Sequence, residues 1–142
     1  MVNTTSLNPA GKRIILADGS PEILAIVEMR LVHLYNIVGK ADDGRQLIES
    51  VRNLQPDIFV TDICIPGISG IEVLHRLRSQ DINIPAVIMT VYEDEELLEA
   101  SLSLGALGFV LKSRIDRDLL PAIQEALKGR TFVSERMRAK HI

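Results

Sequence analysis

Four polar side chains stand directly after short apolar runs of the sequence. They are Asp18, Asp62, Thr90 and Lys112. An acid, a hydroxyl and an amine gathered around a second acid can support phosphoryl transfer. One carboxylate is then the nucleophile, the other binds a metal ion, and the hydroxyl and the ammonium bind the phosphoryl oxygens. These residues are far apart in the chain, so the fold must bring four segments to one place.

Each of these residues also has an ordinary structural interpretation. An Asp after a strand is often a turn former or a helix cap, a Thr is often a plain strand residue, and a Lys is often a solvated charge. Lys112 is the most informative, because a charge after the apolar run 108–111 must either leave the sheet or meet a buried partner. The shared placement of the four residues favours a common site.

Five apolar segments predict the strands that would carry these residues. They cover residues 14–17, 57–61, 86–89 and 109–111, with a weaker segment at 36–39. Runs without strict alternation are typical of a parallel sheet that helices cover on both faces. Helical spacing occupies the stretches 21–34, 44–54, 70–79, 94–104 and 116–128. This alternation predicts a doubly wound α/β fold, whose ligands bind beyond the carboxyl ends of the strands.

Local signals agree with these boundaries. Ser20 before Pro21 and Glu22 predicts the start of the first helix. Pro56 and Pro85 each separate a helix from the strand that follows, because a helix cannot continue through them. After Gly129 the pattern weakens, and residues 131–133 suit only a short extended piece.

Length and composition favour one ordinary globular domain. The chain has 142 residues, of which 46% are apolar and 25% are charged. No stretch approaches the roughly 18 consecutive apolar residues of a membrane span, and the start lacks a signal-peptide core. We therefore expect a cytoplasmic protein without a membrane contact. The single cysteine, Cys64, excludes an internal disulfide and a thiolate zinc cluster.

The charge balance gives no footprint for nucleic acid over the whole chain, since the formal net charge is −3. The end of the chain is locally basic, and both a solvated tail and a DNA contact stay open for it. Its charged residues are Lys128, Arg130, Arg136, Arg138 and Lys140, opposed by Glu135.

Three motifs resemble those of receiver domains from two-component response regulators. The segment 60–70, VTDICIPGISG, is similar to the phosphoacceptor strand and loop of that family. Met89-Thr90 resembles its switch position, and 105–112, GALGFVLK, resembles its G-A-x-G-[YF]-x-x-K motif. The turn 41–44, ADDG, also matches. The resemblance covers about residues 12–129, with 1–11 as an N-terminal tail and 130–142 as a C-terminal tail or linker.

The resemblance implies a flavodoxin-like fold of five parallel strands, in the order 2-1-3-4-5, with five helices. It implies that Asp62 accepts a phosphoryl group from a sensor histidine kinase, that Thr90 binds this group and that Lys112 pairs with its charge. Mg²⁺ would be held by Asp18, Asp62 and the backbone carbonyl of Cys64. Such a domain phosphorylates and dephosphorylates itself and is not a metabolic enzyme.

Three positions depart from the usual family pattern. Gly19 stands where the family has a second acid, so a metal ligand is missing and we expect Mg²⁺ binding to be either weakened or abolished. Val91 and Ser113 are typical of the subgroup with helix-turn-helix output domains related to nitrate-response and quorum-sensing regulators. That output domain would follow Gly129 and would make the only DNA contact, so the chain is either a receiver cut from a longer regulator or a stand-alone protein. Phe109 would be either an aromatic switch residue or a plain core residue.

Three functional hypotheses follow. The leading one is a phosphorylatable receiver that acts in transcriptional regulation and is able to form a homodimer. The alternative is a receiver-like binding module that works independently of phosphate because of Gly19. A nucleotide- or flavin-binding enzyme of the same architecture would need G-x-G-x-x-G after the first strand, and residues 18–21, DGSP, do not match it.

Overall fold

The computed structural model describes residues 11–137. Most of the predicted N-terminal tail, and Arg138 and Lys140 of the basic end, lie outside the described residues. The strands are β1 (Arg13–Ala17), β2 (Asn36–Ala41), β3 (Ile58–Asp62), β4 (Ala86–Thr90), β5 (Gly108–Leu111) and β6 (Phe132–Val133). The α-helices are α1 (Pro21–Leu31), α2 (Gly44–Leu54), α3 (Gly70–Ser79), α4 (Glu95–Ser103) and α5 (Leu120–Leu127).

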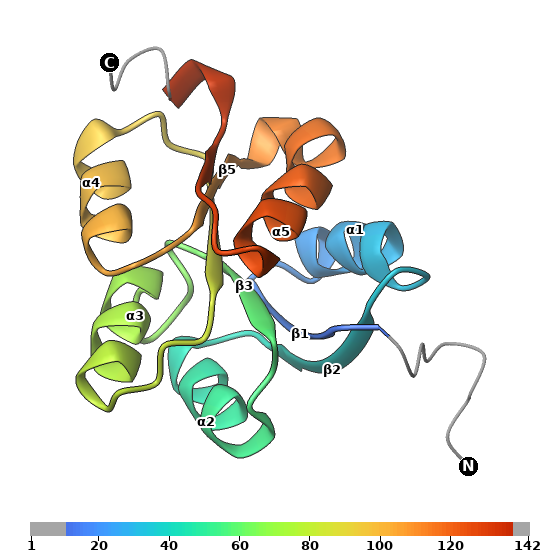
Figure 1. The fold of residues 1–142 in the computed structure, drawn as a ribbon, viewed down its shortest axis with the longest axis vertical. Coiled ribbons are helices and arrows are strands. Elements are labelled where there is room, and N and C mark those ends of the chain that lie inside the picture. Colours follow the sequence, from blue (N-terminus) through green and yellow to red (C-terminus); the bar gives the residue numbers. More distant parts are fainter. Residues whose placement is uncertain (1–10, 138–142) are drawn as a thin grey trace.

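All the strands pair in parallel, in the order β2-β1-β3-β4-β5-β6. Helices α1 and α5 cover one face of the sheet, and α2, α3 and α4 cover the other (Figure 1). Each face has its own apolar core, because the central strands are buried on both sides. The prediction of an α/β sheet in the order 2-1-3-4-5 is confirmed. The prediction of five strands is wrong, because the described chain adds β6 beside β5.

The sixth strand cannot be predicted from the sequence, for a physical reason. It has two residues, which is too short for hydrophobic periodicity to appear, and long-range pairing with β5 creates it. The sequence predicts no more than a short extended piece over residues 131–133. The pairing turns that piece into part of the sheet.

Side-chain caps begin four of the helices. The predicted cap is confirmed, since the Ser20 hydroxyl accepts a hydrogen bond from the Ile23 N–H. Asp43, Ser69 and Asp94 cap α2, α3 and α4 in the same way. Three of these caps follow a strand at the carboxyl edge of the sheet after a short loop, so each helix starts close to the edge where the site lies.

The last helical segment is not the single helix that the sequence predicts over residues 116–128. A 3-10 turn, η2 (Lys112–Arg114), and a π-helix, η3 (Ile115–Leu119), precede α5. Pro121 has no N–H to donate to the carbonyl of Arg117, so the α-helical pattern is interrupted there. The first helix also ends at Leu31 rather than at 34.

Candidate functional site

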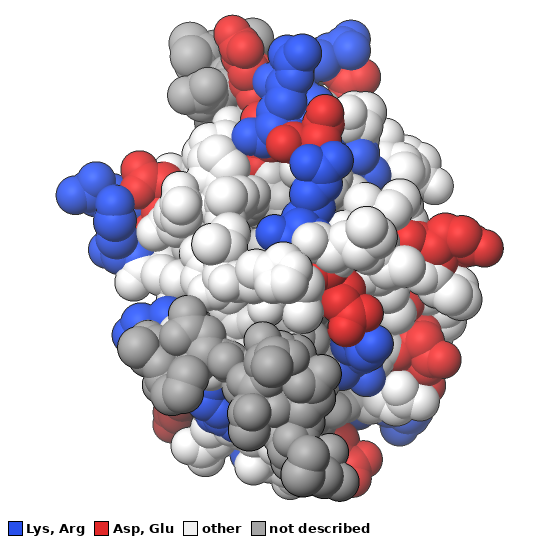
Figure 2. All heavy atoms as spheres, turned by 90° about the vertical axis from the view of Figure 1, so that its right-hand side faces the viewer, with Lys and Arg blue, Asp and Glu red and all other residues white. Residues whose placement is uncertain are grey.

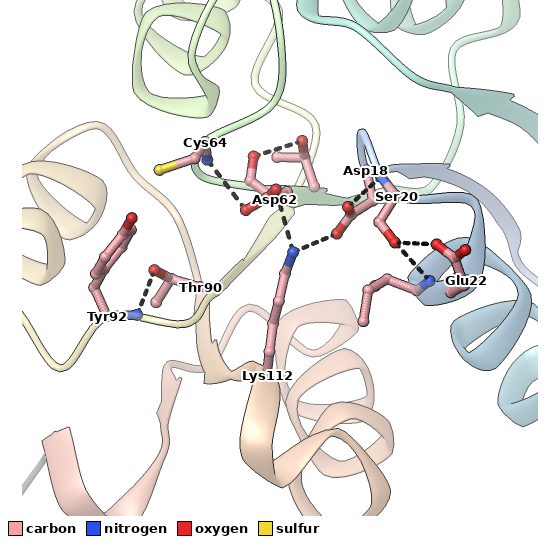
Figure 3. A network of polar contacts seen from close by, with 10 residues as sticks. Asp18, Ser20, Glu22, Asp62, Cys64, Thr90, Tyr92 and Lys112 are labelled. Carbon is pink, nitrogen blue, oxygen red and sulfur yellow. Dashed lines mark hydrogen bonds and ion pairs between the residues drawn. The ribbon is translucent and has the colours of Figure 1, made fainter.

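Three of the predicted residues meet at the carboxyl edge of the sheet (Figure 3). Asp18 follows β1, Asp62 ends β3 and Lys112 follows β5. The Lys112 Nζ lies 2.7 Å from Asp18 Oδ2 and 3.2 Å from Asp62 Oδ2. The side chains of Asp18, Lys112 and Asp62 are 2%, 11% and 13% exposed, so this ion-pair cluster is largely shielded from water.

The ammonium of Lys112 is held in its charged form. Burial disfavours the charge, but the neighbouring Asp18 and Asp62 carboxylates outweigh it and raise the pKa of Lys112 above its ordinary value. The bond to Asp18 is the largest of these favourable effects. One cation thus pairs with two carboxylates in a partly dehydrated pocket, which leaves a formal charge of −1.

Backbone N–H groups orient the other carboxylate oxygens. The Ser20 N–H donates to Asp18 Oδ1 at 2.8 Å, and the Cys64 N–H donates to Asp62 Oδ1 at 3.1 Å. These two donors cannot be predicted from the sequence, because backbone groups leave no signal in residue identity. They fix the rotamers of both acids and leave one oxygen of each for Lys112.

Thr90 lies on the same edge, at the end of β4, but outside the ion-pair cluster. It is completely buried, and its hydroxyl accepts a hydrogen bond of 3.0 Å from the Tyr92 N–H. Within residues 11–137 it makes no hydrogen bond to Asp62. Phe109, on β5, is also completely buried, and its ring belongs to the core on the α2–α4 side of the sheet.

The loop after Asp62 is held close to the sheet. The Gly70 N–H donates to the Ile63 carbonyl at 2.8 Å, and a Cβ on Gly70 would lie 2.7 Å from the Asp62 carbonyl oxygen. A side chain at position 70 would therefore push α3 away from β3. This close approach explains why a glycine ends the motif that contains Asp62.

The structure gives a steric reason for Gly19. Its backbone is not in the left-handed region, since the described glycines with positive φ are Gly67, Gly105 and Gly129. A Cβ at position 19 would instead lie 2.6 Å from Cδ of Pro66, in the loop after β3. The ring of Pro66 fills the space that a second acid would need.

The oxygen atoms of the site are ligands of the kind that a hard cation prefers, but the protein supplies few of them. Asp18 Oδ2 is buried and has no hydrogen-bond partner, and the ammonium of Lys112 is its ion-pair partner. Two carboxylates and the Cys64 carbonyl match what Mg²⁺ accepts, and Mg²⁺ keeps several waters. No group of three or more His, Cys, Asp and Glu side chains suited to a metal occurs among the described residues. A metal here would depend on backbone and water ligands.

The surface seen in Figure 2 carries both signs of charge, with a largely uncharged middle. No patch of one sign dominates that face, which agrees with the formal net charge of −3. An electrostatic footprint for nucleic acid is therefore absent from the described part of that face. Over residues 11–137 the helices are also too short or too polar to cross a membrane.

Comparison with known proteins shows the family of this chain. Residues 14–124 match the family model described as the response regulator receiver domain. The chain is 34% identical over 125 residues to the nitrate/nitrite response regulator protein NarL of Escherichia coli (strain K12), covering 86% of this chain and 57% of NarL. It thus spans less than two thirds of that relative.

Solved structures of related response regulators have the same fold as this chain. A two-component response regulator of the LuxR family from Aurantimonas sp. SI85-9A1 has a TM-score of 0.86 and 28% identity, over 93% of this chain and 96% of that one. The signal receiver domain of the NarL regulator from Mycobacterium tuberculosis has a TM-score of 0.80 and 27% identity, over 86% and 100% of the two chains.

A doubly wound sheet with two acids and a lysine at its carboxyl edge is typical of the class of proteins called receiver domains. This chain belongs to the response regulator receiver family. Members of that family are signalling domains rather than metabolic enzymes. The homologues of this chain are NarL-type regulators of the LuxR family. This confirms the subgroup of receivers with helix-turn-helix output domains, which Val91 and Ser113 indicated.

Proposed function

We propose that this chain is a phosphorylatable receiver whose phosphoacceptor is Asp62. The observation that carries the proposal is the ion-pair cluster, in which Lys112 Nζ lies within 3.2 Å of carboxylate oxygens from both Asp18 and Asp62. Of the two acids, Asp62 is the more exposed, which suits a nucleophile that must meet a donor from solution.

The proposed reaction is an in-line displacement at phosphorus. A carboxylate oxygen of Asp62 forms a bond to the phosphorus of a phosphohistidine on a sensor kinase, and the P–N bond breaks. The electron pair of that bond stays on the imidazole nitrogen, which takes a proton from water and leaves as neutral imidazole. Lys112 remains charged throughout and offsets the negative charge of the phosphoryl oxygens. Later attack by water on the same phosphorus releases inorganic phosphate and restores the carboxylate.

The other groups have supporting roles in this proposal. Asp18, Asp62 and the Cys64 carbonyl would hold Mg²⁺, which supplies further positive charge when bound. The Thr90 hydroxyl would leave the Tyr92 N–H and donate to a phosphoryl oxygen. The Cys64 thiol has no part in the reaction.

The consequences for partners follow from the family. A structure of RcsB from Salmonella enterica serovar Typhimurium, with 26% identity to this chain and a TM-score of 0.82, is bound to promoter P1flhDC in the presence of phosphomimetic BeF3−. It covers 91% of this chain, which covers 65% of RcsB. We propose that this receiver likewise serves transcription through an output domain outside the chain, with a histidine kinase as donor and a homodimer as the phosphorylated form.

A second function rests on the missing acid. Pro66 closes the space beside Gly19, and Asp18 already has Lys112 as an ion-pair partner without a metal. The domain would then be a binding module that acts independently of phosphate.

Intact mass after incubation with acetyl phosphate and Mg²⁺ separates the two. We expect the addition of one phosphoryl group, and no addition in Asp62→Asn. Labelling that persists in Asp62→Asn would place the phosphoacceptor elsewhere, and a wild-type chain that takes no label would favour the binding module.

A further inference from the structure

The C-terminal part of the described chain docks on the outer edge of β5. The Phe132 N–H donates to the Leu107 carbonyl at 2.8 Å, and the Ser134 N–H donates to the Phe109 carbonyl at 2.9 Å. Residues 135–137 then form a helical turn. We call residues 132–137 the latch. Figure 1 shows it running beside β5, between α4 and α5.

The latch closes the core at this edge of the sheet. Val133 lies opposite Phe109 in the parallel register, and Val133 and Met137 belong to the same apolar cluster as Phe109 and Leu98 of α4. Met137 and Phe109 are completely buried. The ring of Phe109 is therefore enclosed partly by residues that lie more than 20 positions later in the chain.

A buried polar group ties the latch to the segment that carries Lys112. The Ser134 hydroxyl donates to Asp118 Oδ2 at 2.7 Å and accepts from the Leu111 N–H at 3.0 Å. Asp118 also receives a bond of 2.8 Å from Arg114 Nε. Ser134 and Asp118 are 0% and 6% exposed, so these bonds are shielded from water. Leu111 is the residue directly before Lys112.

A second anchor reaches the loop after Thr90. Arg136 Nε lies 3.1 Å from Glu93 Oε1. Glu93 follows Tyr92, whose N–H donates to the Thr90 hydroxyl. The latch thus contacts the chain beside both residues that would respond to a phosphoryl group.

We propose that the β5 edge is a strand-docking site, occupied by the latch of the same chain, and that phosphorylation of Asp62 weakens this docking. The inference rests on the proposed function of Asp62. A phosphoryl group draws Lys112 away from Asp18 and draws the Thr90 hydroxyl away from the Tyr92 N–H. Both movements disturb an anchor of the latch, and an equilibrium that phosphorylation shifts must in turn shift phosphorylation.

Amide hydrogen exchange tests the first half of this coupling. In the full chain, the Phe132 and Ser134 amides should exchange at least about tenfold faster with acetyl phosphate and Mg²⁺, because release of a local segment exposes its own hydrogen bonds. The Leu47 amide, bonded to the Asp43 carbonyl in α2, is the internal control and should not change. Equal or slower exchange at Phe132 and Ser134, in a chain whose mass shows the phosphoryl group, would contradict the proposal that phosphorylation weakens latch docking.

Variants test the reverse direction. Ser134→Ala removes the buried link, and Arg136→Gln removes the exposed anchor, so each should tighten the equilibrium binding of the phosphomimetic BeF3− at Asp62 several-fold. Arg130→Gln is the matched control, because Arg130 pairs with Glu125 of α5 and not with the loop after Thr90. Equal affinities for BeF3− in Arg136→Gln, Arg130→Gln and the wild type would contradict the coupling even if Ser134→Ala failed to fold. If the wild type never takes a phosphoryl group, both the proposed function of Asp62 and the proposed control of latch docking are contradicted.

Discussion

At the scale of single residues, the balance of charge around Asp18 and Asp62 depends on Lys112. Removing its ammonium leaves two carboxylates close together with little water around them. We expect Lys112→Ala to lower the free energy of unfolding by about 3 kcal/mol, the cost typical of breaking a buried ion pair. Chemical denaturation measures this value. Lys40→Ala is the control, since its surface pair with Glu28 should be worth about 0–1 kcal/mol.

This contribution also has a pH dependence of defined sign. The pKa of Lys112 is raised above its ordinary value of 10.5, so the ion pairs stabilise the fold fully below that pH and lose their effect as pH rises through the higher folded pKa. The stability difference between the wild type and Lys112→Ala should therefore be constant at neutral pH and shrink above about pH 10.5. A difference that shrinks on acidification alone would contradict this assignment.

The same variant tests the role of Lys112 in signalling. Lys112→Ala should still fold, and it should respond less to phosphorylation because the phosphoryl charge loses its partner. Unchanged activation would show that Lys112 has only a structural role.

Gly19 is constrained by its neighbour and not by its backbone angle. Gly19→Asp should destabilise the domain by about 1–3 kcal/mol, because its Cβ overlaps the ring of Pro66. Adding Pro66→Ala should recover most of this loss, since the backbone bond from the Gly44 N–H to the carbonyl of residue 66 remains possible. Thermal unfolding of the two single variants and the double variant measures the coupling.

The double variant also restores the acid that the family usually has. It should bind Mg²⁺ at least about tenfold more tightly than the wild type, a change typical of gaining or losing even an outer ligand. Titration calorimetry gives the affinity. An unchanged affinity in a folded double variant would mean that position 19 does not point into the pocket.

At the scale of elements, α4 depends on its cap. Asp94 Oδ1 accepts from the Glu96 and Leu97 N–H groups, and the helix has only nine residues. We expect Asp94→Ala to cost about 1 kcal/mol and to speed amide exchange at Glu96 and Leu97, whereas Asp94→Asn should change little. Equal exchange in all three proteins would show that packing alone holds the first turn.

At the scale of the whole molecule, α1 offers a second copy an exposed apolar surface. Its residues Ile26 and Met29 are 45% and 78% exposed. Since the NarL-type subgroup is confirmed, we expect phosphorylated copies to associate through α1 and α5. Acetyl phosphate with Mg²⁺ should increase association, and Met29→Glu should weaken it about tenfold, equivalent to about 1.4 kcal/mol.

Sedimentation equilibrium measures this association. Leu54→Glu, on the opposite side of the sheet, is the control and should behave as the wild type. Identical association with and without the phosphoryl group would favour a module that works independently of phosphate.

The sequence by itself determined the alternation of strands and helices and the edge where the site would lie, because runs of neighbouring residues and caps such as Ser20 report these features directly. The order of the first five strands came only from the resemblance to receiver domains. Phosphorylation itself is not tested by the fold and stays a prediction.

Only the tertiary structure decided what lies beside what. It brought Lys112 to both Asp18 and Asp62, placed Pro66 against Gly19, and joined Ser134 to Asp118 and the end of β5. These contacts join residues 16 to 94 positions apart, where no local pattern reports them. The same holds for β6, because two residues become a strand only when β5 supplies the hydrogen-bonding edge.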